Sequence, residues 1–180
     1  QTNIFYGKRA NGKPWHTMII RGGGMGASSR FDGHHCAIFP ANGANTPVEI
    51  LESDTPLIVE ERGLVMDSGG PGKQRGGIGR QMIIRSPEDG EHSPKRTTIA
   101  VQAGRFVYPP NGMFNGKNGS KAKFLKNDEN ADPSGLTFLD PGDRISFVSA
   151  GGGGYGDPFE RDPEAVEKDV LYGYVSIEKA

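Results

Sequence analysis

Short apolar runs recur along this chain, and glycine or proline ends most of them. Runs of four to eight residues that are bounded by turn-forming residues are typical of β-strands. The pattern predicts a set of strands at residues 15–20, 47–51, 57–60, 79–85, 97–101, 122–125, 136–139 and 144–148. Residues 140–143 (Asp-Pro-Gly-Asp) predict a β-turn, because proline presets φ for such a turn, and residues 87–90 predict a second turn that would link a hairpin.

Only one segment carries a full set of helix signals, residues 163–172. Asp162 is placed to cap its N-terminus, Pro163 suits the first helical position, and Gly173 suits the left-handed residue that ends many helices. Residues 176–180 look like the first turn of another helix.

Glycine accounts for 28 of the 180 residues, about twice its usual share, while apolar residues make up only 34%. This composition favours a loop-rich β protein or a part of a larger assembly. We therefore predict a mainly β fold, a glycine-rich β-sandwich or barrel-like domain with a short C-terminal helix. The predicted division is a β-rich domain at residues 1–160 and a helical extension at residues 161–180.

Charge and cysteine content narrow the classes of partner and compartment. The formal net charge of −1 argues against a nucleic-acid partner, which needs a concentrated basic surface. No apolar run approaches the ~20 residues of a membrane span, so we predict no membrane partner. The single cysteine, Cys36, excludes an intrachain disulfide and fits a reducing cytoplasm. Because the chain begins with Gln1 rather than methionine, we expect a piece of a longer polypeptide.

Three glycine clusters fit nucleotide-binding patterns only in part. Residues 22–27 and 151–156 satisfy G-x-G-x-x-G or its alanine variant after a predicted strand, but no helix opens on the third position. Residues 69–77 contain Gly-Lys but lack the first glycine and the Ser/Thr of a Walker loop. We interpret all three as structural turns or partner-docking loops. Lys73 and Arg75, beside bare backbone amides, are weaker candidates for binding an anion.

The most reactive side chains gather in residues 32–36. On an extended strand Asp32, His34 and Cys36 would share one side and His35 the other. Asp32, His34 and His35 are candidate catalytic residues, because carboxylates and imidazoles can move protons near neutral pH. The same groups could hold a divalent metal, or a histidine could activate the cysteine, but the pattern identifies no definite metal ligands. A buried structural histidine or a surface turn is the alternative. We expect this segment to lie closer to the active cleft than the last glycine cluster.

Four motifs in order resemble the hydantoinase B family, which includes N-methylhydantoinase B subunits, half of the 5-oxoprolinases, and subunits of acetone and acetophenone carboxylases. The motifs are GGMGA with Asp32-Gly33, NTPVEILE at 45–52, DSGGPG through RGGIG at 67–79, and GGGGYGDP with RDP at 151–163. Each motif alone is weak, whereas the ordered set is specific. The resemblance covers only the C-terminal part of such a subunit.

The resemblance implies an ATP-dependent complex with a hydantoinase A type partner, which would bind ATP and magnesium and phosphorylate a carbonyl oxygen of a small-molecule substrate. The B-type subunit would then hydrolyse a cyclic amide of the hydantoin or 5-oxoproline type, or carboxylate a ketone. It also implies that catalytic and divalent-metal ligands lie mainly in the remainder of the B subunit, which precedes this chain. A non-catalytic scaffold that docks the ATP-using subunit is a third possibility.

Overall fold

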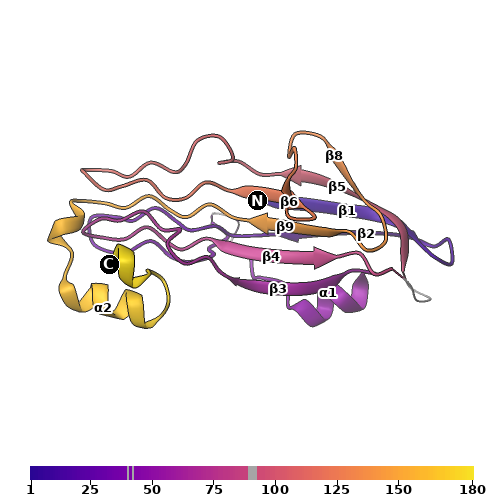
Figure 1. Cartoon of the computed structure of the whole chain (residues 1–180), viewed down its shortest axis with the longest axis horizontal. Helices are drawn as coiled ribbons and strands as arrows, with labels where there is room; N and C mark the ends of the chain where they lie inside the picture. The colour runs from indigo at the N-terminus through magenta and orange to yellow at the C-terminus, as the bar shows by residue number, and fades with distance from the viewer. Residues whose placement is uncertain (40, 42, 89–92) are drawn as a thin grey trace.

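The chain folds into two antiparallel β-sheets with few helices (Figure 1). The computed structural model describes residues 1–39, 41, 43–88 and 93–180. One sheet has the strand order β2-β1-β5-β8 and the other has the order β3-β4-β9-β6-β7. The strands are β1 (Thr2–Arg9), β2 (Pro14–Ile20), β3 (Ile58–Leu64), β4 (Arg80–Arg85), β5 (Pro94–Gln102), β6 (Lys123–Lys126), β7 (Glu129–Asn130), β8 (Leu136–Leu139) and β9 (Arg144–Val148). The helical elements are α1 (Val48–Asp54), η1 (Pro158–Glu160), α2 (Pro163–Leu171) and η2 (Ile177–Lys179). The predicted mainly β fold with a short C-terminal helix is confirmed.

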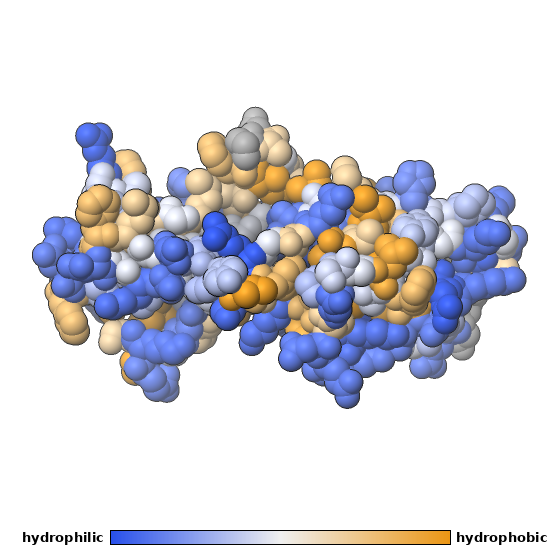
Figure 2. Space-filling view, turned by 90° about the horizontal axis from the view of Figure 1, so that it is seen from above, coloured by the Kyte–Doolittle hydropathy of each residue, from blue (hydrophilic) through white to orange (hydrophobic). Residues whose placement is uncertain are grey.

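The outward face of the β2-β1-β5-β8 sheet is unusually apolar. Strand pairing places Met18 opposite Ile4, Ile4 opposite Ala100, and Ala100 opposite Leu136 in one row across all four strands. Met18 and Leu136 are more than half exposed, at 57% and 55%. Figure 2 shows hydrophobic side chains gathered on the half of the molecule that holds the strands. Exposed apolar patches of this kind mark interaction surfaces.

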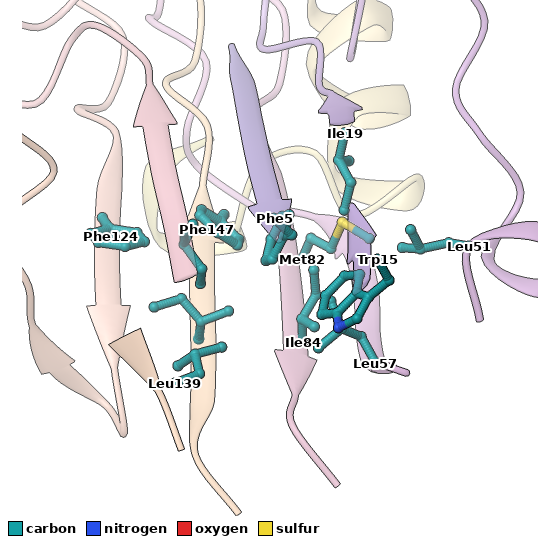
Figure 3. Close-up of a cluster of buried hydrophobic side chains, with 12 residues drawn as sticks. Phe5, Trp15, Ile19, Leu51, Leu57, Met82, Ile84, Phe124, Leu139 and Phe147 are labelled. Atoms are coloured by element: carbon teal, nitrogen blue, oxygen red, sulfur yellow. The ribbon is translucent and has the colours of Figure 1, made fainter. Parts of the chain in front are cut away.

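The opposite faces of the sheets meet in one hydrophobic core (Figure 3). Phe5 and Phe147 are fully buried and touch edge to face, with ring centroids 5.9 Å apart. Phe124 packs on the other side of Phe147 at 5.3 Å. Because side chains alternate along a strand, Phe5 points into this core while its neighbour Tyr6 is 40% exposed on the outward face.

Past the ends of the strands the chain continues as a packed set of extended segments. We call residues 22–26, 69–77, 116–119 and 151–154 the glycine array. Backbone hydrogen bonds of 2.7–2.9 Å join its segments, for example from Gly77 N to Met25 O and from Gly152 N to Gly77 O. A Cβ added to Gly24, Gly76, Gly77 or Gly152 would overlap the backbone of a neighbouring segment. Most of these glycines therefore serve close backbone approach rather than positive φ.

The prediction of a strand at residues 47–51 is wrong, because Val48–Asp54 form helix α1. A short apolar run is compatible with the two-residue repeat of a strand and with the 3.6-residue repeat of a helix. In this segment only Leu51 faces the core, while Ile50 is half exposed. Thr55 ends the helix through bonds from its N (3.0 Å) and Oγ1 (2.8 Å) to Leu51 O. Strands β1 and β7 were not predicted.

Other local predictions are confirmed. Helix α2 begins at Pro163, with Asp162 Oδ1 accepting from Glu164 N at 3.0 Å. The turn at residues 140–143 closes through a bond from Asp143 N to Asp140 O at 3.1 Å. Within residues 176–180, Ile177–Lys179 form a single 3₁₀ turn, η2. The second turn predicted at 87–90 lies partly outside the described residues. Of the helices in the described part of the chain, none has the length and apolar character needed to cross a membrane.

Candidate functional site

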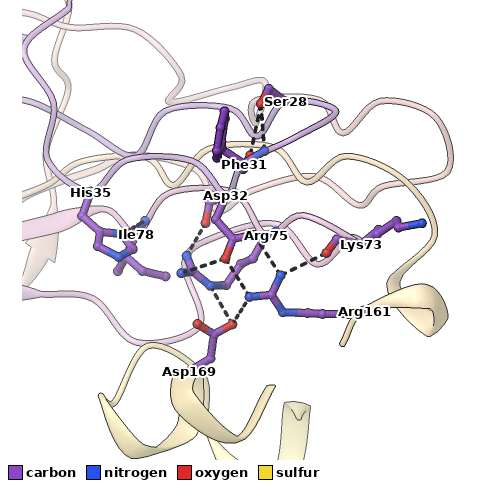
Figure 4. Close-up of polar contacts among 10 residues, drawn as sticks. Ser28, Phe31, Asp32, His35, Lys73, Arg75, Ile78, Arg161 and Asp169 are labelled. Carbon is purple, nitrogen blue, oxygen red and sulfur yellow. Dashed lines mark hydrogen bonds and ion pairs between the residues drawn. The ribbon is translucent and has the colours of Figure 1, made fainter. Parts of the chain in front are cut away.

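Two arginines and two aspartates form a buried ion cluster where α2 meets the glycine array (Figure 4). Arg161 Nη2 lies 2.7 Å from Asp169 Oδ2 and 2.8 Å from Asp32 Oδ2. Arg75 Nε donates to the same Asp169 oxygen at 2.9 Å, and Asp32 Oδ1 accepts from Arg75 N at 2.7 Å. The side chains of Arg75, Asp169 and Arg161 are only 6%, 8% and 9% exposed. We call these four residues the ion cluster.

The ion cluster joins four distant parts of the chain. Asp32 follows the first glycine segment, Arg75 lies in the second, Arg161 follows η1, and Asp169 lies in α2. It therefore fastens residues 161–180 to the β-rich part. Burial opposes ionisation of Asp32, but the hydrogen bonds and charges of Arg161 and Arg75 outweigh it and lower the pKa of that carboxyl.

His35 is held in the wall of this region. Its Nδ1 accepts from Ile78 N at 2.9 Å, so the ring is neutral with its proton on Nε2. The ring lies against Tyr174, with ring centroids 4.4 Å apart. The guanidinium carbon of Arg75 lies 5.2 Å from the centroid of the same tyrosine ring. Burial and the charge of Arg75 lower the pKa of His35, while the charges of Asp169 and Asp32 act in the other direction.

Residues 32–36 do not form the extended strand considered above, because Asp32 and His35 both make inward contacts while His34 is exposed. Burial raises the pKa of the Cys36 thiol despite the nearby charges of Arg80 and Arg62. A raised pKa keeps the thiol protonated, which disfavours Cys36 as a nucleophile. Among the described residues no group of His, Cys, Asp and Glu side chains is arranged to hold a metal ion.

The amides beside Lys73 and Arg75 are already bonded within the chain. Lys73 N donates to Gly156 O at 3.3 Å, and Gly76 N donates to Gly70 O at 2.9 Å. Lys73 Nζ is exposed and pairs with Glu160 at 3.1 Å. Amides with internal acceptors do not cradle a phosphate, so this loop does not fit a nucleotide's phosphate chain.

A cavity of about 550 Å³ borders the ion cluster. Its lining includes Arg75, Arg161 and Asp169 of the ion cluster, together with Phe159, Val175 and Lys179. Asp67, which also lines it, accepts from Ser176 N at 2.8 Å. The volume lies in the range of small-molecule pockets.

Residues 1–158 match the sequence model of the family described as hydantoinase B/oxoprolinase. The chain belongs to this family. It is 28% identical over 193 residues to the caprolactamase subunit beta of Pseudomonas jessenii, covering 96% of this chain and 31% of the relative. It is 27% identical to the acetophenone carboxylase delta subunit of Aromatoleum aromaticum, covering 87% of this chain and 28% of that subunit.

The fold of this hydantoinase B-type chain matches the crystal structure of the ATP-dependent caprolactamase from P. jessenii. The TM-score is 0.77 with 26% identity, and the match covers 99% of this chain and 32% of the other. The chain spans 24–31% of the length of the first curated relatives it matches.

Two members of the ion cluster, Arg161 and Asp169, were not among the predicted site residues. The signal for Asp169 was weak but present, because it is a carboxylate between Val166 and Val170 on the apolar side of α2. Arg161 appears in the sequence only as part of the RDP motif. Its partner Asp32 lies 129 residues away.

The neutral state of His35 predicts a pH-dependent stability for the hydantoinase B-type chain. Its folded pKa is below the ordinary 6.5. The stabilising contribution is therefore complete above about pH 6.5 and is lost as the pH falls through the folded pKa. We expect the melting temperature of the intact protein to fall between about pH 7.5 and about pH 5.5, and His35→Gln to remove part of this slope. The matched control is His34→Gln at the exposed neighbour; a slope lost equally in both variants would contradict the assignment.

Proposed function

We propose that this chain is the C-terminal part of a hydantoinase B-type subunit in an ATP-dependent complex that hydrolyses a cyclic amide. The observation that carries the proposal is the match over 99% of the chain to a caprolactamase named as ATP-dependent, at 26% identity. Caprolactam is a ring amide, as hydantoins and 5-oxoproline are. The same opening reaction serves all three.

In this proposal a hydantoinase A type partner binds ATP with magnesium and transfers a phosphoryl group to the amide oxygen. Water then adds to the activated carbon, and the ring C–N bond breaks as the amine leaves with a proton. A second water hydrolyses the resulting acyl phosphate to a carboxylate and phosphate. The bonded amides of residues 73–77 support placing the nucleotide on the partner rather than on this chain. A divalent metal in the remainder of the B subunit would polarise the water or the carbonyl oxygen. In this proposal the complex works in the cytoplasm.

The chain's own part is to form a rigid wall. Asp32 and His35 would position that wall through Arg161, Arg75 and Ile78. Of the three candidate residues Asp32, His34 and His35, His34 is the exposed one. Its imidazole is therefore the group that could reach a substrate. The cavity beside the ion cluster is a candidate recess for a small molecule.

Two alternatives rest on specific observations. The 27% identity to an acetophenone carboxylase delta subunit favours ATP-dependent ketone carboxylation. The apolar outward face of the β2-β1-β5-β8 sheet favours a scaffold role, because such a surface is suited to packing against the rest of the subunit or its partner.

The test is turnover by the intact complex, with the whole B subunit and its partner. Hydantoin, 5-oxoproline and caprolactam are supplied with ATP, and acetone and acetophenone with ATP and bicarbonate. We expect ATP-dependent ring opening of at least one cyclic amide, and no turnover by the isolated 180-residue chain. Carboxylation without ring opening would favour the ketone alternative, and turnover by the isolated chain would contradict the assignment of the active site to the larger assembly.

A further inference from the structure

Two buried arginines at the base of the strands contrast with those of the ion cluster. Arg21 directly follows β2 and Arg80 opens β4; they are 2% and 5% exposed. Within residues 1–39, 41, 43–88 and 93–180, neither guanidinium has an Asp or Glu oxygen within 4.0 Å. Arg75, which is equally buried, has two such partners.

The partners that Arg21 and Arg80 do have are neutral. Arg80 Nη1 donates to Asn45 Oδ1 at 2.6 Å, and Arg21 Nη2 donates to Gln1 Oε1 at 3.2 Å. With the Asn3 amide turned so that its oxygen faces Arg21, that oxygen accepts from Nε at 2.7 Å and from Nη2 at 2.9 Å. None of these groups carries a negative charge, so the cations are hydrogen-bonded without being neutralised.

Each of these two arginines has one nitrogen without an acceptor among the described residues, Nη1 of Arg21 and Nε of Arg80. Both are screened from water. Buried N–H groups normally find partners, and leaving a charged donor unpaired is costly. The arrangement therefore has the form of half of an ion pair.

Further positive charge lies close to both arginines. Burial and the charge of Arg80 lower the pKa of Arg21 to about 9, so Arg21 remains charged at neutral pH. Burial and the charge of Arg62 also lower the pKa of Arg80. Arg62 adds a third positive charge close to Arg80, and its own Nη1 donates to a neutral carbonyl, Thr46 O, at 2.7 Å. Placing like charges together away from water is unfavourable unless an anion compensates.

We propose that Arg21 and Arg80 together hold a carboxylate that the described residues of this chain do not supply. A guanidinium matches the two oxygens of a carboxylate, and one such group offers an acceptor to each orphan N–H. Its source is an Asp or Glu side chain of the remaining part of the hydantoinase B-type subunit, since the relatives are about three times as long. A packed side chain suits donors that are screened from water better than a freely exchanging solute does. A free carboxylate is the other source that the test must separate.

The direct test is an experimental structure of the intact subunit in its complex. We expect a carboxylate oxygen within about 3 Å of Arg21 Nη1 or Arg80 Nε. A side-chain oxygen identifies the subunit as the source, and an oxygen of a small molecule identifies a ligand site. Both arginines still without an acidic partner in the complete subunit would overturn the proposal.

A second test uses Arg21→Met in the intact complex, with Arg96→Met as control, because Arg96 is exposed and already paired with Asp140 at 2.8 Å. If the partner is a side-chain carboxylate, Arg21→Met leaves that carboxylate buried without its cation. We then expect the melting temperature to fall by about 5 °C or more in both sodium acetate and sodium chloride. With a free carboxylate, the wild type gains thermal stability in sodium acetate relative to sodium chloride of equal ionic strength, and the variant loses this response. If Arg21→Met instead melts at a higher temperature, and the wild type gains no stability in acetate, Arg21 is a buried cation without any carboxylate partner. That result would overturn the proposal. If the variant does not fold, the structure of the wild-type complex decides alone.

Discussion

Replacing Gly152 with alanine is expected to prevent the chain from folding or to lower its free energy of unfolding by more than about 3 kcal/mol. The added Cβ would overlap the carbonyl of Met25 and crowd Gly26 N, both of which are backbone atoms. The same segment is fixed from other sides, because Gly152 N donates to Gly77 O and Gly152 O accepts from Gly70 N, each at 2.8 Å. Backbone held on several sides has no flexible side chain that could move away. The yield and melting temperature of the intact complex measure the effect.

Gly135→Ala is the matched control. No heavy atom lies within 4 Å of a Cβ at that position, and its φ is outside the left-handed region, so we expect stability close to that of the wild type. A stable Gly152→Ala protein with unchanged melting temperature would show that the glycine array can spread without cost, contrary to the packing described above.

Replacing Asp169 with asparagine is expected to destabilise the protein by about 3–5 kcal/mol. Among the described residues, the change leaves Arg75 and Arg161, whose side chains are 6% and 9% exposed, with only Asp32 as a carboxylate partner. A buried cation that loses its partner costs far more than an exposed pair contributes. Because Asp169 anchors α2, we also expect faster proteolysis within residues 161–180.

Glu160→Gln is the control for this change. It breaks the Lys73–Glu160 pair, whose side chains are 54% and 62% exposed, and we expect less than about 1 kcal/mol of effect. Equal losses in the two variants would mean that burial of the ion cluster carries no special weight. Intact stability in Asp169→Asn would mean that the extension is held by its apolar contacts.

Gly152→Ala and Asp169→Asn test the two sets of contacts that hold the end of the molecule at α2 together. The glycine array brings backbone segments together without side chains, and the ion cluster ties α2 and the C-terminal turn to that array (Figures 1 and 4). A rigid wall beside a cavity is what a positioning role in a larger active site requires. The proposed function rests on this geometry together with the family relationship.

The sequence by itself determined the features whose signals lie within a few residues of one another. The strand at residues 144–148, the turn at 140–143 and the N-cap of α2 depend on local alternation, on proline geometry and on a side chain that accepts from an amide two residues away. The ordered glycine motifs were also enough to identify the family, because their spacing along the chain carries the information without any contact.

Only the tertiary structure decided what the reactive and glycine residues do. Whether residues 47–51 form a strand or a helix was decided by packing, because Leu51 is the one residue of this segment that is buried in the core. Asp32 and His35 could be read as catalytic from their chemistry, yet their observed partners, Arg161 and Ile78, lie 129 and 43 residues away. Most glycines of the glycine array, likewise, are explained by backbone atoms of other segments and not by their own φ angles. Contacts over such separations arise from the packing of the whole chain, which no local pattern encodes.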